Sequence, residues 1–163
     1  MPFSDIPRPG EPAGAAVQIA LPDQNGVERR LADFAGRIVV LYFYPRDGTP
    51  GCTVEGKEFR DLDDQFQALD CAIVGVSVDS VESHREFALK HALPFTLLSD
   101  SNGELASAFG VMGEGGVAIR STFILGTDLR LIRAFRDISP RGHAQQMLTF
   151  VRSMVESHRM LGG

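Results

Sequence analysis

Hydrophobic residues along this chain form two kinds of pattern that alternate with one another. The stretch from Ile38 to Tyr44 is apolar throughout, as expected for a strand buried on both faces of a sheet, and the stretch from Ala72 to Val78 repeats that pattern. Between them, from Thr53 to Leu69, apolar side chains recur every three or four residues and charged side chains fill the other positions. This spacing predicts an amphipathic helix between two buried strands.

The remaining segments continue the alternation. The Asn25-Gly26 pair lies between the apolar stretches 17–21 and 27–31 and predicts a β-hairpin. The later elements follow in order: a helix from Val81 to Ala92, a strand from Phe95 to Leu98, a short helix from Gly103 to Phe109, a hairpin of Ser121 to Leu125 and Leu131 to Phe135, and a closing helix from Gly142 to Leu161. This order predicts an α/β, thioredoxin-like fold, with a central mixed β-sheet flanked by helices and an N-terminal β-hairpin.

The domain organisation is simple. The chain has 163 residues, 44% of them hydrophobic and 23% charged, which suits one globular domain with a sizeable core. Residues 1–14 are rich in proline and glycine and predict an extended leader. No repeat, low-complexity segment or linker interrupts the rest, so we expect a single domain over residues 1–163.

Charge and cysteine content narrow the class of function. The net charge is −5 and no basic stripe is present, which argues against nucleic acid as a partner. No apolar run approaches membrane-spanning length, and the N-terminus lacks a cationic start followed by an apolar stretch. These features favour a cytoplasmic protein that does not contact a membrane. Its two cysteines are then expected to be free or catalytic rather than joined in a structural disulfide.

Cys52 is the strongest candidate for chemistry. It follows a Thr49-Pro50-Gly51 turn and precedes the predicted helix, so it should lie near the surface at the helix N-terminus. Free backbone N–H groups and the positive end of the helix dipole favour the thiolate there, and the thiolate is the nucleophilic form. The alternative is a buried, inert cysteine. The position after a turn favours the reactive interpretation.

The residues around Cys52 resemble a known family. The spacing of Pro45, Thr49 and Cys52, followed by Glu55, is similar to the active-site motif of the peroxiredoxins, and the longer string from Tyr42 resembles their bacterioferritin comigratory protein, or peroxiredoxin Q, branch. The similarity extends over most of the chain. Its other segments are the opening hairpin, the strands ending in Gly75-Val76-Ser77-Val78-Asp79 and Phe95-Thr96-Leu97-Leu98, and the segment Arg120-Ser121-Thr122-Phe123.

The resemblance implies a thiol-dependent peroxidase with a defined role for each site residue. Cys52 would attack the O–O bond of hydrogen peroxide or an organic hydroperoxide and become a sulfenic acid. The Thr49 hydroxyl and the Gly51 backbone N–H would donate to the peroxide, and Arg120 would stabilise the thiolate and the developing charge. Pro45 would shield the thiolate from water, and Glu55 would hold Arg120 by a charge-assisted hydrogen bond. No cofactor and no metal are implied.

The chain departs from its relatives at the resolving cysteine. Relatives carry this second cysteine five residues after the first or on the next helix, where this chain has Lys57 and Ala88. Cys71 opens the second buried strand, which should run parallel to the first, so the two thiols are expected at opposite edges of the sheet. A seven-residue strand spans roughly 23 Å, whereas a disulfide needs Cα atoms within about 7 Å. Cys71 is therefore expected to be a core residue.

A one-cysteine mechanism requires a reductant from outside: thioredoxin, glutaredoxin with glutathione, or another thiol. The protein is expected to be a monomer or a homodimer. Two other interpretations remain open. The segment from Gly51 to Gly56-Lys57 imitates a nucleotide-binding P-loop, but Glu58 replaces the required Ser or Thr. A thioredoxin-fold binding or holdase protein with an incidental cysteine is the non-enzyme alternative.

The four histidines offer no clear alternative chemistry. His84, His91, His143 and His158 fall on predicted helices or at helix starts and are expected mainly on the surface. None is close to Cys52 in sequence, so nothing indicates a Cys–His hydrolase. Together with two distant cysteines they have no metal-ligand spacing.

Overall fold

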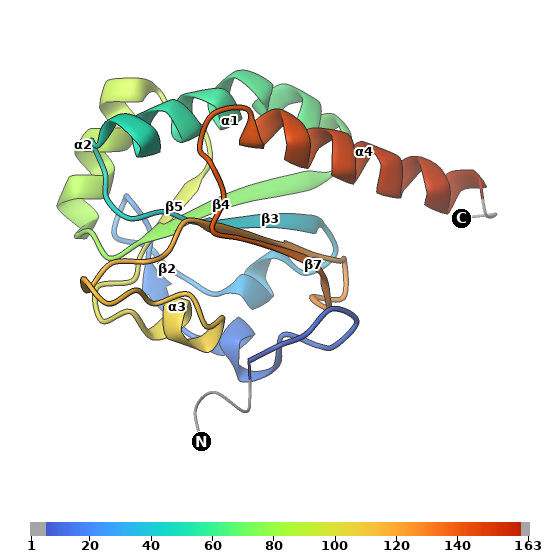
Figure 1. Ribbon diagram of the computed structural model, residues 1–163, viewed down its shortest axis with the longest axis horizontal. Coiled ribbons are helices and arrows are strands. Elements are labelled where there is room, and N and C mark those ends of the chain that lie inside the picture. The colour runs from blue at the N-terminus through green and yellow to red at the C-terminus, as the bar shows by residue number, and fades with distance from the viewer. Residues whose placement is uncertain (1–5, 161–163) are drawn as a thin grey trace.

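A five-stranded mixed sheet forms the centre of the computed structural model, which describes residues 6–160 (Figure 1). In spatial order its strands are β5 (Thr96–Ser99), β4 (Cys71–Ser77), β3 (Ile38–Phe43), β6 (Ser121–Leu125) and β7 (Leu131–Arg136). Strands β3, β4 and β5 are parallel, whereas β6 is antiparallel to both β3 and β7. This is the predicted thioredoxin-like arrangement.

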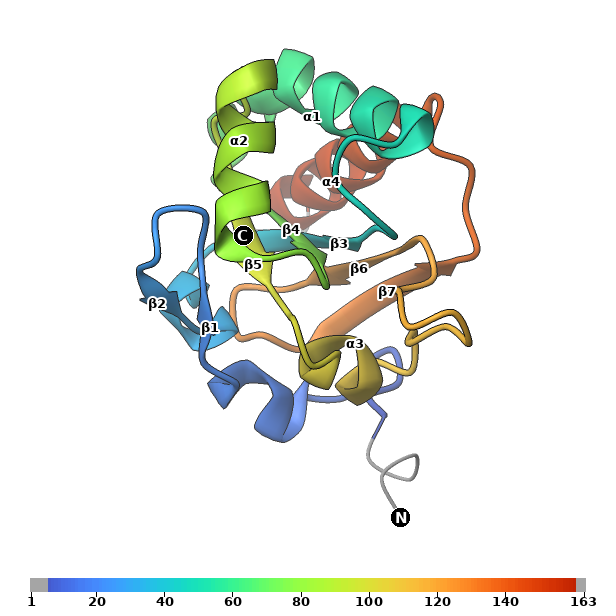
Figure 2. The same cartoon turned by 90° about the vertical axis from the view of Figure 1, so that its left-hand side faces the viewer.

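The helices cover the sheet unequally. Three long helices lie on one face: α1 (Pro50–Ala68), α2 (Val81–His91) and α4 (His143–Met160) (Figures 1 and 2). The other face is covered by α3 (Glu104–Ala108) and by two 3-10 helices, Gly14–Gln18 and Leu31–Phe34. The side chains of β3 alternate between the two core clusters, as the period of two requires. Within residues 6–160, no helix is long and apolar enough to cross a membrane.

Helix α1 begins earlier than its apolar pattern predicted. It starts at Pro50 rather than Thr53, with Thr49 as the N-cap residue. Proline suits this first position because its fixed φ angle is already helical and its missing N–H would have had no partner within the helix. Outside the N-terminal hairpin, the expected ends of the other strands and helices agree with the observed ones to within one residue, and Leu161, the expected end of the last helix, lies outside the described residues.

The N-terminal region differs most from expectation. The predicted strand over residues 17–21 shrinks to β1 (Leu21–Pro22), which pairs with β2 (Glu28–Arg29), because the 3-10 helix takes the preceding residues. The turn itself is as predicted, and the buried Asp23 carboxylate fixes it by accepting from the backbone N–H groups of residues 25 and 27. Of the extended leader expected over residues 1–14, the part from residue 6 is bonded to the sheet, since the Gly10 N–H donates to the Leu131 carbonyl at 2.7 Å, and residues 1–5 lie outside the described residues.

Two of the four histidines are buried, which corrects the expectation of surface positions. His84 is 0% exposed and His143 is 1% exposed. Each lies on the stripe of its helix that faces the sheet: His84 is followed three residues later by Phe87, and His143 four residues later by Met147, both buried. The side chains of His91 and His158 reach solvent.

The parallel pairing of β3 and β4 places Cys71 as predicted. Ile38 pairs with Cys71 at the start of both strands, and Phe43 pairs with Val76 near their ends. Cys52 follows β3 and therefore lies beyond the opposite edge of the sheet. The Cys71 side chain is fully buried.

A close approach between strands gives a test of this packing. A Cβ atom on Gly75 of β4 would lie 2.8 Å from a Leu97 methyl carbon and 3.0 Å from the Tyr42 ring. Gly75→Val should therefore lower the free energy of unfolding by about 1–3 kcal/mol through overpacking, measured by urea denaturation. Gly115→Val is the matched control, because no atom lies within 4 Å of its Cβ position. Equal stability of the two variants would contradict the packing described here.

Candidate active site

Cys52 lies in the first turn of α1, two residues after Pro50. The backbone N–H groups of this turn have no acceptor within the helix, and the helix dipole is positive here, so the position can stabilise negative charge. The Cys52 side chain is only 2% exposed, which corrects the expectation of a surface thiol. It belongs to the core cluster between the sheet and the long helices, because the first turn of α1 presents it inward.

Arg120 joins Cys52 to a buried carboxylate. Its Nη2 lies 3.4 Å from the Cys52 sulfur, and its Nη1 donates to Glu55 Oε1 at 2.6 Å. Arg120 immediately precedes β6, and Glu55 is one helical turn beyond Cys52 on α1. Gly51 permits this approach, since a Cβ atom there would lie 3.0 Å from Arg120 Nη2. Four of the residues predicted for the site therefore meet at one point.

Burial of Glu55 and Arg120 changes the pKa values of both groups. Glu55 is fully buried, and desolvation raises the pKa of its carboxyl from 4.5 to about 7, against the opposing pull of Arg120. Burial works against the charge of Arg120, but Glu55 and Cys52 outweigh it and raise the pKa of the guanidinium. The guanidinium thus remains a cation 3.4 Å from the Cys52 sulfur.

Thr49 and Pro45 lie in the loop between β3 and α1. Both are half-buried. The Thr49 hydroxyl donates to the Arg46 carbonyl at 3.0 Å, and the Thr49 carbonyl accepts from the Thr53 N–H at 2.9 Å. The hydroxyl proton is thus already used in a hydrogen bond within the loop. The hydroxyl has to rotate away from the Arg46 carbonyl before it can donate to a substrate. The roles of Thr49 and Pro45 toward a peroxide remain predictions.

A buried polar layer beneath the site was missed by the sequence analysis. Tyr42 stacks on Phe59 of α1 with ring centroids 4.6 Å apart, and His143 Nε2 lies 2.8 Å from Thr122 Oγ1. Burial lowers the pKa of His143 to about 4, and the charge of Arg120 adds to this effect, so the ring is neutral at pH 7. The signal in the sequence was the spacing of His143 from Met147, which places both on the buried stripe of α4.

The second thiol and the two positions of resolving cysteines offer no partner to Cys52. Burial raises the pKa of Cys71 to about 12, so this thiol stays protonated and unreactive at neutral pH. Lys57 is exposed on α1, and Ala88 is buried on α2. The chain has no third cysteine.

The P-loop interpretation does not fit the structure. Gly51 and Gly56 both lie inside α1, so the segment between them is helical. A phosphate cradle needs a loop of backbone N–H groups before the helix, whereas here the N–H groups from Thr53 onward bond along the helix.

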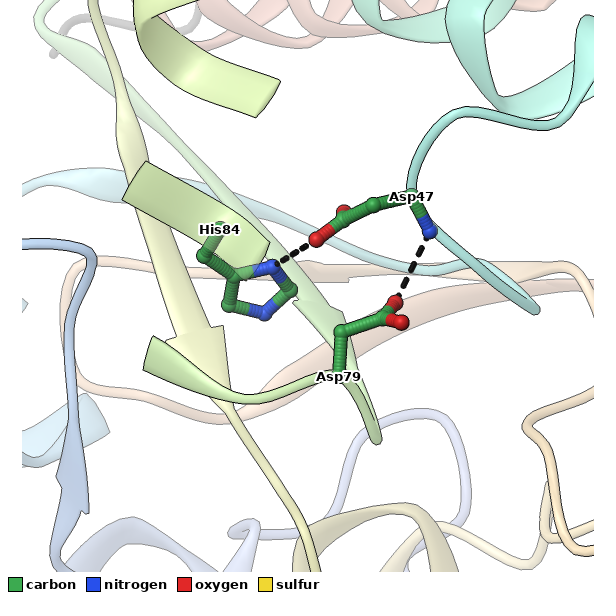
Figure 3. A group of neighbouring side chains, drawn as sticks. All are labelled: Asp47, Asp79 and His84. Carbon is green, nitrogen blue, oxygen red and sulfur yellow. Dashed lines mark hydrogen bonds and ion pairs between the residues drawn. The ribbon is translucent and has the colours of Figure 1, made fainter. Parts of the chain in front are cut away.

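A second polar group lies on the other side of the β3–α1 loop, where Asp47, Asp79 and His84 converge (Figure 3). Asp47 Oδ2 lies 2.7 Å from His84 Nδ1, and the Asp47 backbone N–H donates to Asp79 Oδ2 at 2.8 Å. The sequence analysis assigned no role to these three residues.

Comparison with known proteins agrees with the motif and the geometry. The model of the AhpC/TSA family matches residues 12–134. The chain is 41% identical over 148 residues to peroxiredoxin Bcp of Bacillus subtilis, an alignment that covers 86% of this chain and 94% of that protein. The chain belongs to the AhpC/TSA peroxiredoxin family.

Solved structures place it in the same branch. Peroxiredoxin Q of Xanthomonas campestris superposes with a TM-score of 0.84 at 36% identity, covering 90% of this chain and 97% of the other. A second structure, of the X. campestris bacterioferritin comigratory protein in work on its alkyl peroxide reduction activity, has a TM-score of 0.84 at 35% identity and covers 90% and 98%. The protein is thus a peroxiredoxin-type peroxidase of the Bcp/peroxiredoxin Q branch, with the thioredoxin-like fold that the sequence predicted.

The raised pKa of Glu55 makes a prediction about stability. In the unfolded chain this carboxyl loses its proton near pH 4.5, whereas in the folded peroxiredoxin it keeps the proton up to about pH 7. The folded state therefore binds more protons in this window, and its stability falls as pH rises through it. Glu55→Gln removes this effect, so the free energy of unfolding of the wild type minus that of the variant should decrease from pH 4.5 to 7. Urea denaturation at several pH values measures this difference, and a constant difference would contradict the assignment.

Proposed function

We propose that this peroxiredoxin reduces hydrogen peroxide and alkyl hydroperoxides with Cys52 as its only redox-active cysteine. The Cys52 thiolate attacks one peroxide oxygen, the O–O bond breaks, and the alkoxide or hydroxide leaves and takes up a proton. Cys52 becomes a sulfenic acid. The observation that carries the proposal is the contact of Arg120 with the Cys52 sulfur at 3.4 Å, while a buried carboxylate holds the same guanidinium at 2.6 Å.

Arg120 supplies the electrostatic part of the proposed reaction. Negative charge moves from the sulfur to the leaving oxygen, and a fixed cation beside this path stabilises the transition state without reorganising. Glu55 fixes the orientation of the planar Arg120 guanidinium. Its carboxylate binds Nη1, and Nη2 then faces the Cys52 sulfur. Thr49 and the Gly51 N–H are proposed donors to the peroxide, and Pro45 a shield against water.

The second half of the cycle requires an external thiol. Two molecules of a thiol return the sulfenic acid to the thiolate, releasing water and a disulfide of the reductant through a mixed disulfide at Cys52. The candidates are thioredoxin, glutaredoxin with glutathione, or another thiol. Because Cys52 is 2% exposed, we infer that the first turn of α1 moves when the reductant reaches the sulfur. A cytoplasmic monomer or homodimer is the form we propose.

The proposed one-cysteine mechanism predicts a simple product. One equivalent of peroxide without added thiol should add one oxygen to Cys52 and leave Cys71 reduced, as measured by mass spectrometry of the intact and digested protein. Excess peroxide should drive Cys52 to sulfinic acid, because no nearby thiol traps the sulfenic acid. A thiol added with the first equivalent should give a mixed disulfide. Cys71→Ser is the control and should behave like the wild type.

A rapid and quantitative disulfide between Cys52 and Cys71 within one chain would overturn the one-cysteine mechanism. A holdase with an incidental cysteine would show no fast oxidation of Cys52 in a stopped-flow experiment. The two outcomes are separable, because the first still consumes peroxide.

Replacement of Arg120 tests whether its charge and geometry stabilise the transition state. Arg120→Lys keeps the charge but loses the planar fork that contacts Cys52 and Glu55 together. We expect the second-order rate constant for oxidation of Cys52 to fall by about tenfold or more, the scale of losing one preorganised donor. Arg159→Lys, at the exposed end of α4, is the matched control. An unchanged rate in Arg120→Lys would remove this residue from the site.

A further inference from the structure

The loop that precedes Cys52 is bonded to α2 through a buried histidine (Figure 3). His84 is 0% exposed, and its Nδ1 lies 2.7 Å from Oδ2 of Asp47, a residue of this loop. The other carboxylate oxygen of Asp47 accepts from the Tyr44 hydroxyl at 2.6 Å. Neither Asp47 nor His84 belongs to the peroxiredoxin site described above.

The hydrogen-bond geometry of His84 indicates how many protons its ring and the Asp47 carboxylate share. Its Nε2 lies 3.0 Å from the Leu98 carbonyl oxygen, which can only accept, so Nε2 carries a proton. A neutral ring would then have a lone pair on Nδ1, directed at a carboxylate oxygen 2.7 Å away. Two lone pairs at that distance repel. A second proton therefore lies between His84 and Asp47.

The surroundings of Asp47 decide which residue holds this second proton. Besides His84, the carboxylate accepts from the Ser83 hydroxyl at 2.9 Å and from the Tyr44 hydroxyl. Burial first, and the negative charge of Asp47 among the further causes, raises the pKa of Tyr44 well above 10, so this phenol is a donor. Hydrogen bonds donated to a carboxylate favour its ionised form. The proton thus belongs to His84, and the two residues form a buried ion pair.

The convergence of Asp47, Asp79 and His84 is a hydrogen-bonded group and not a metal site. The ring nitrogen that faces Asp47 carries a proton and so offers no lone pair to a cation. Asp79 Oδ2 accepts from the Ser77 hydroxyl at 2.6 Å and from the Asp47 backbone N–H at 2.8 Å. The donors and acceptors of the group satisfy one another.

We propose that His84 is a positioning residue for the peroxidase reaction. Its ring carries two protons, and it holds Asp47 and thereby the loop of residues 45–49 against α2 and β5. That loop ends at Thr49, the N-cap of α1, three residues before Cys52. The ion pair with Asp47 fixes the first turn of α1 and the peroxide-binding groups around the sulfur. This inference rests on the proposed reaction of Cys52 with hydroperoxides.

The protonation of His84 is tested by NMR of 15N-labelled protein at pH 7. The signals of His84 are assigned by their absence in His84→Gln. We expect both ring nitrogens of the wild type to show attached protons, and we expect the Nδ1 proton to be lost in Asp47→Asn, whose amide N–H can donate to a neutral ring. A wild-type ring with a single proton would overturn the proposal.

The positioning role is tested by stopped-flow oxidation of Cys52 with hydrogen peroxide. His84→Gln and Asp47→Asn should each lower the second-order rate constant by about tenfold or more, the scale expected when reacting groups are displaced by a fraction of an ångström. The double variant should be no slower than the slower single variant, because both changes remove the same ion pair. His158→Gln, exposed on α4, is the control and should keep the wild-type rate.

The possible outcomes separate this inference from the function on which it rests. A wild type that fails to react with peroxide overturns the proposed function, whereas the NMR result still decides the protonation of His84. A reactive wild type together with unchanged rates in both single variants overturns the positioning role. If His84→Gln fails to fold, Asp47→Asn carries the kinetic test alone.

Discussion

A buried, hydrogen-bonded pair of Glu55 and Arg120 organises the candidate active site. The two residues are 65 positions apart in the chain, Glu55 on α1 and Arg120 just before β6, and their contact places a guanidinium nitrogen 3.4 Å from the Cys52 sulfur. Burying a carboxylate is costly, which is why desolvation raises the pKa of Glu55 to about 7. Because Arg120 compensates only part of that cost, the arrangement is better explained by the chemistry of the thiolate than by stability.

The fold brings the segments that carry Glu55 and Arg120 to the same edge of the sheet. The parallel run from β3 to β4 leaves the N-terminus of α1 at the carboxyl edge of the sheet, where N–H groups and the helix dipole are available. The antiparallel pairing of β3 with β6 brings the residue before β6 to the same edge, since Phe43 at the end of β3 pairs with Ser121. The central strand thereby positions both Cys52 and Arg120, the proposed nucleophile and its cation.

Polar side chains buried on both sides of the β3–α1 loop extend this organisation. Tyr42 and His143 both pack against Phe59 of α1, and His84 and Asp47 bond the loop to α2. Buried polar groups are expensive unless they are paired, so their concentration around one loop indicates that its conformation matters. The resemblance to this branch implies that α2 is one of two places for a resolving cysteine. In this chain that helix has Ala88 there and is bonded to the active-site loop.

The sequence alone determined the order of the elements and the placement of Cys71 away from Cys52, and it predicted site residues, of which Cys52, Glu55, Gly51 and Arg120 lie together in the structure. These follow from local patterns: apolar runs, helical spacing, and a motif whose residues are close together in the chain. Only the tertiary structure decided that Cys52 is buried, that α1 begins at Pro50, and that His84 and His143 face the core. Burial depends on what packs against a residue from distant segments. The hydrogen bond from the Ser83 hydroxyl to Asp47 and the contact of Arg120 with Cys52 join positions 36 and 68 residues apart, and no local pattern records such distances.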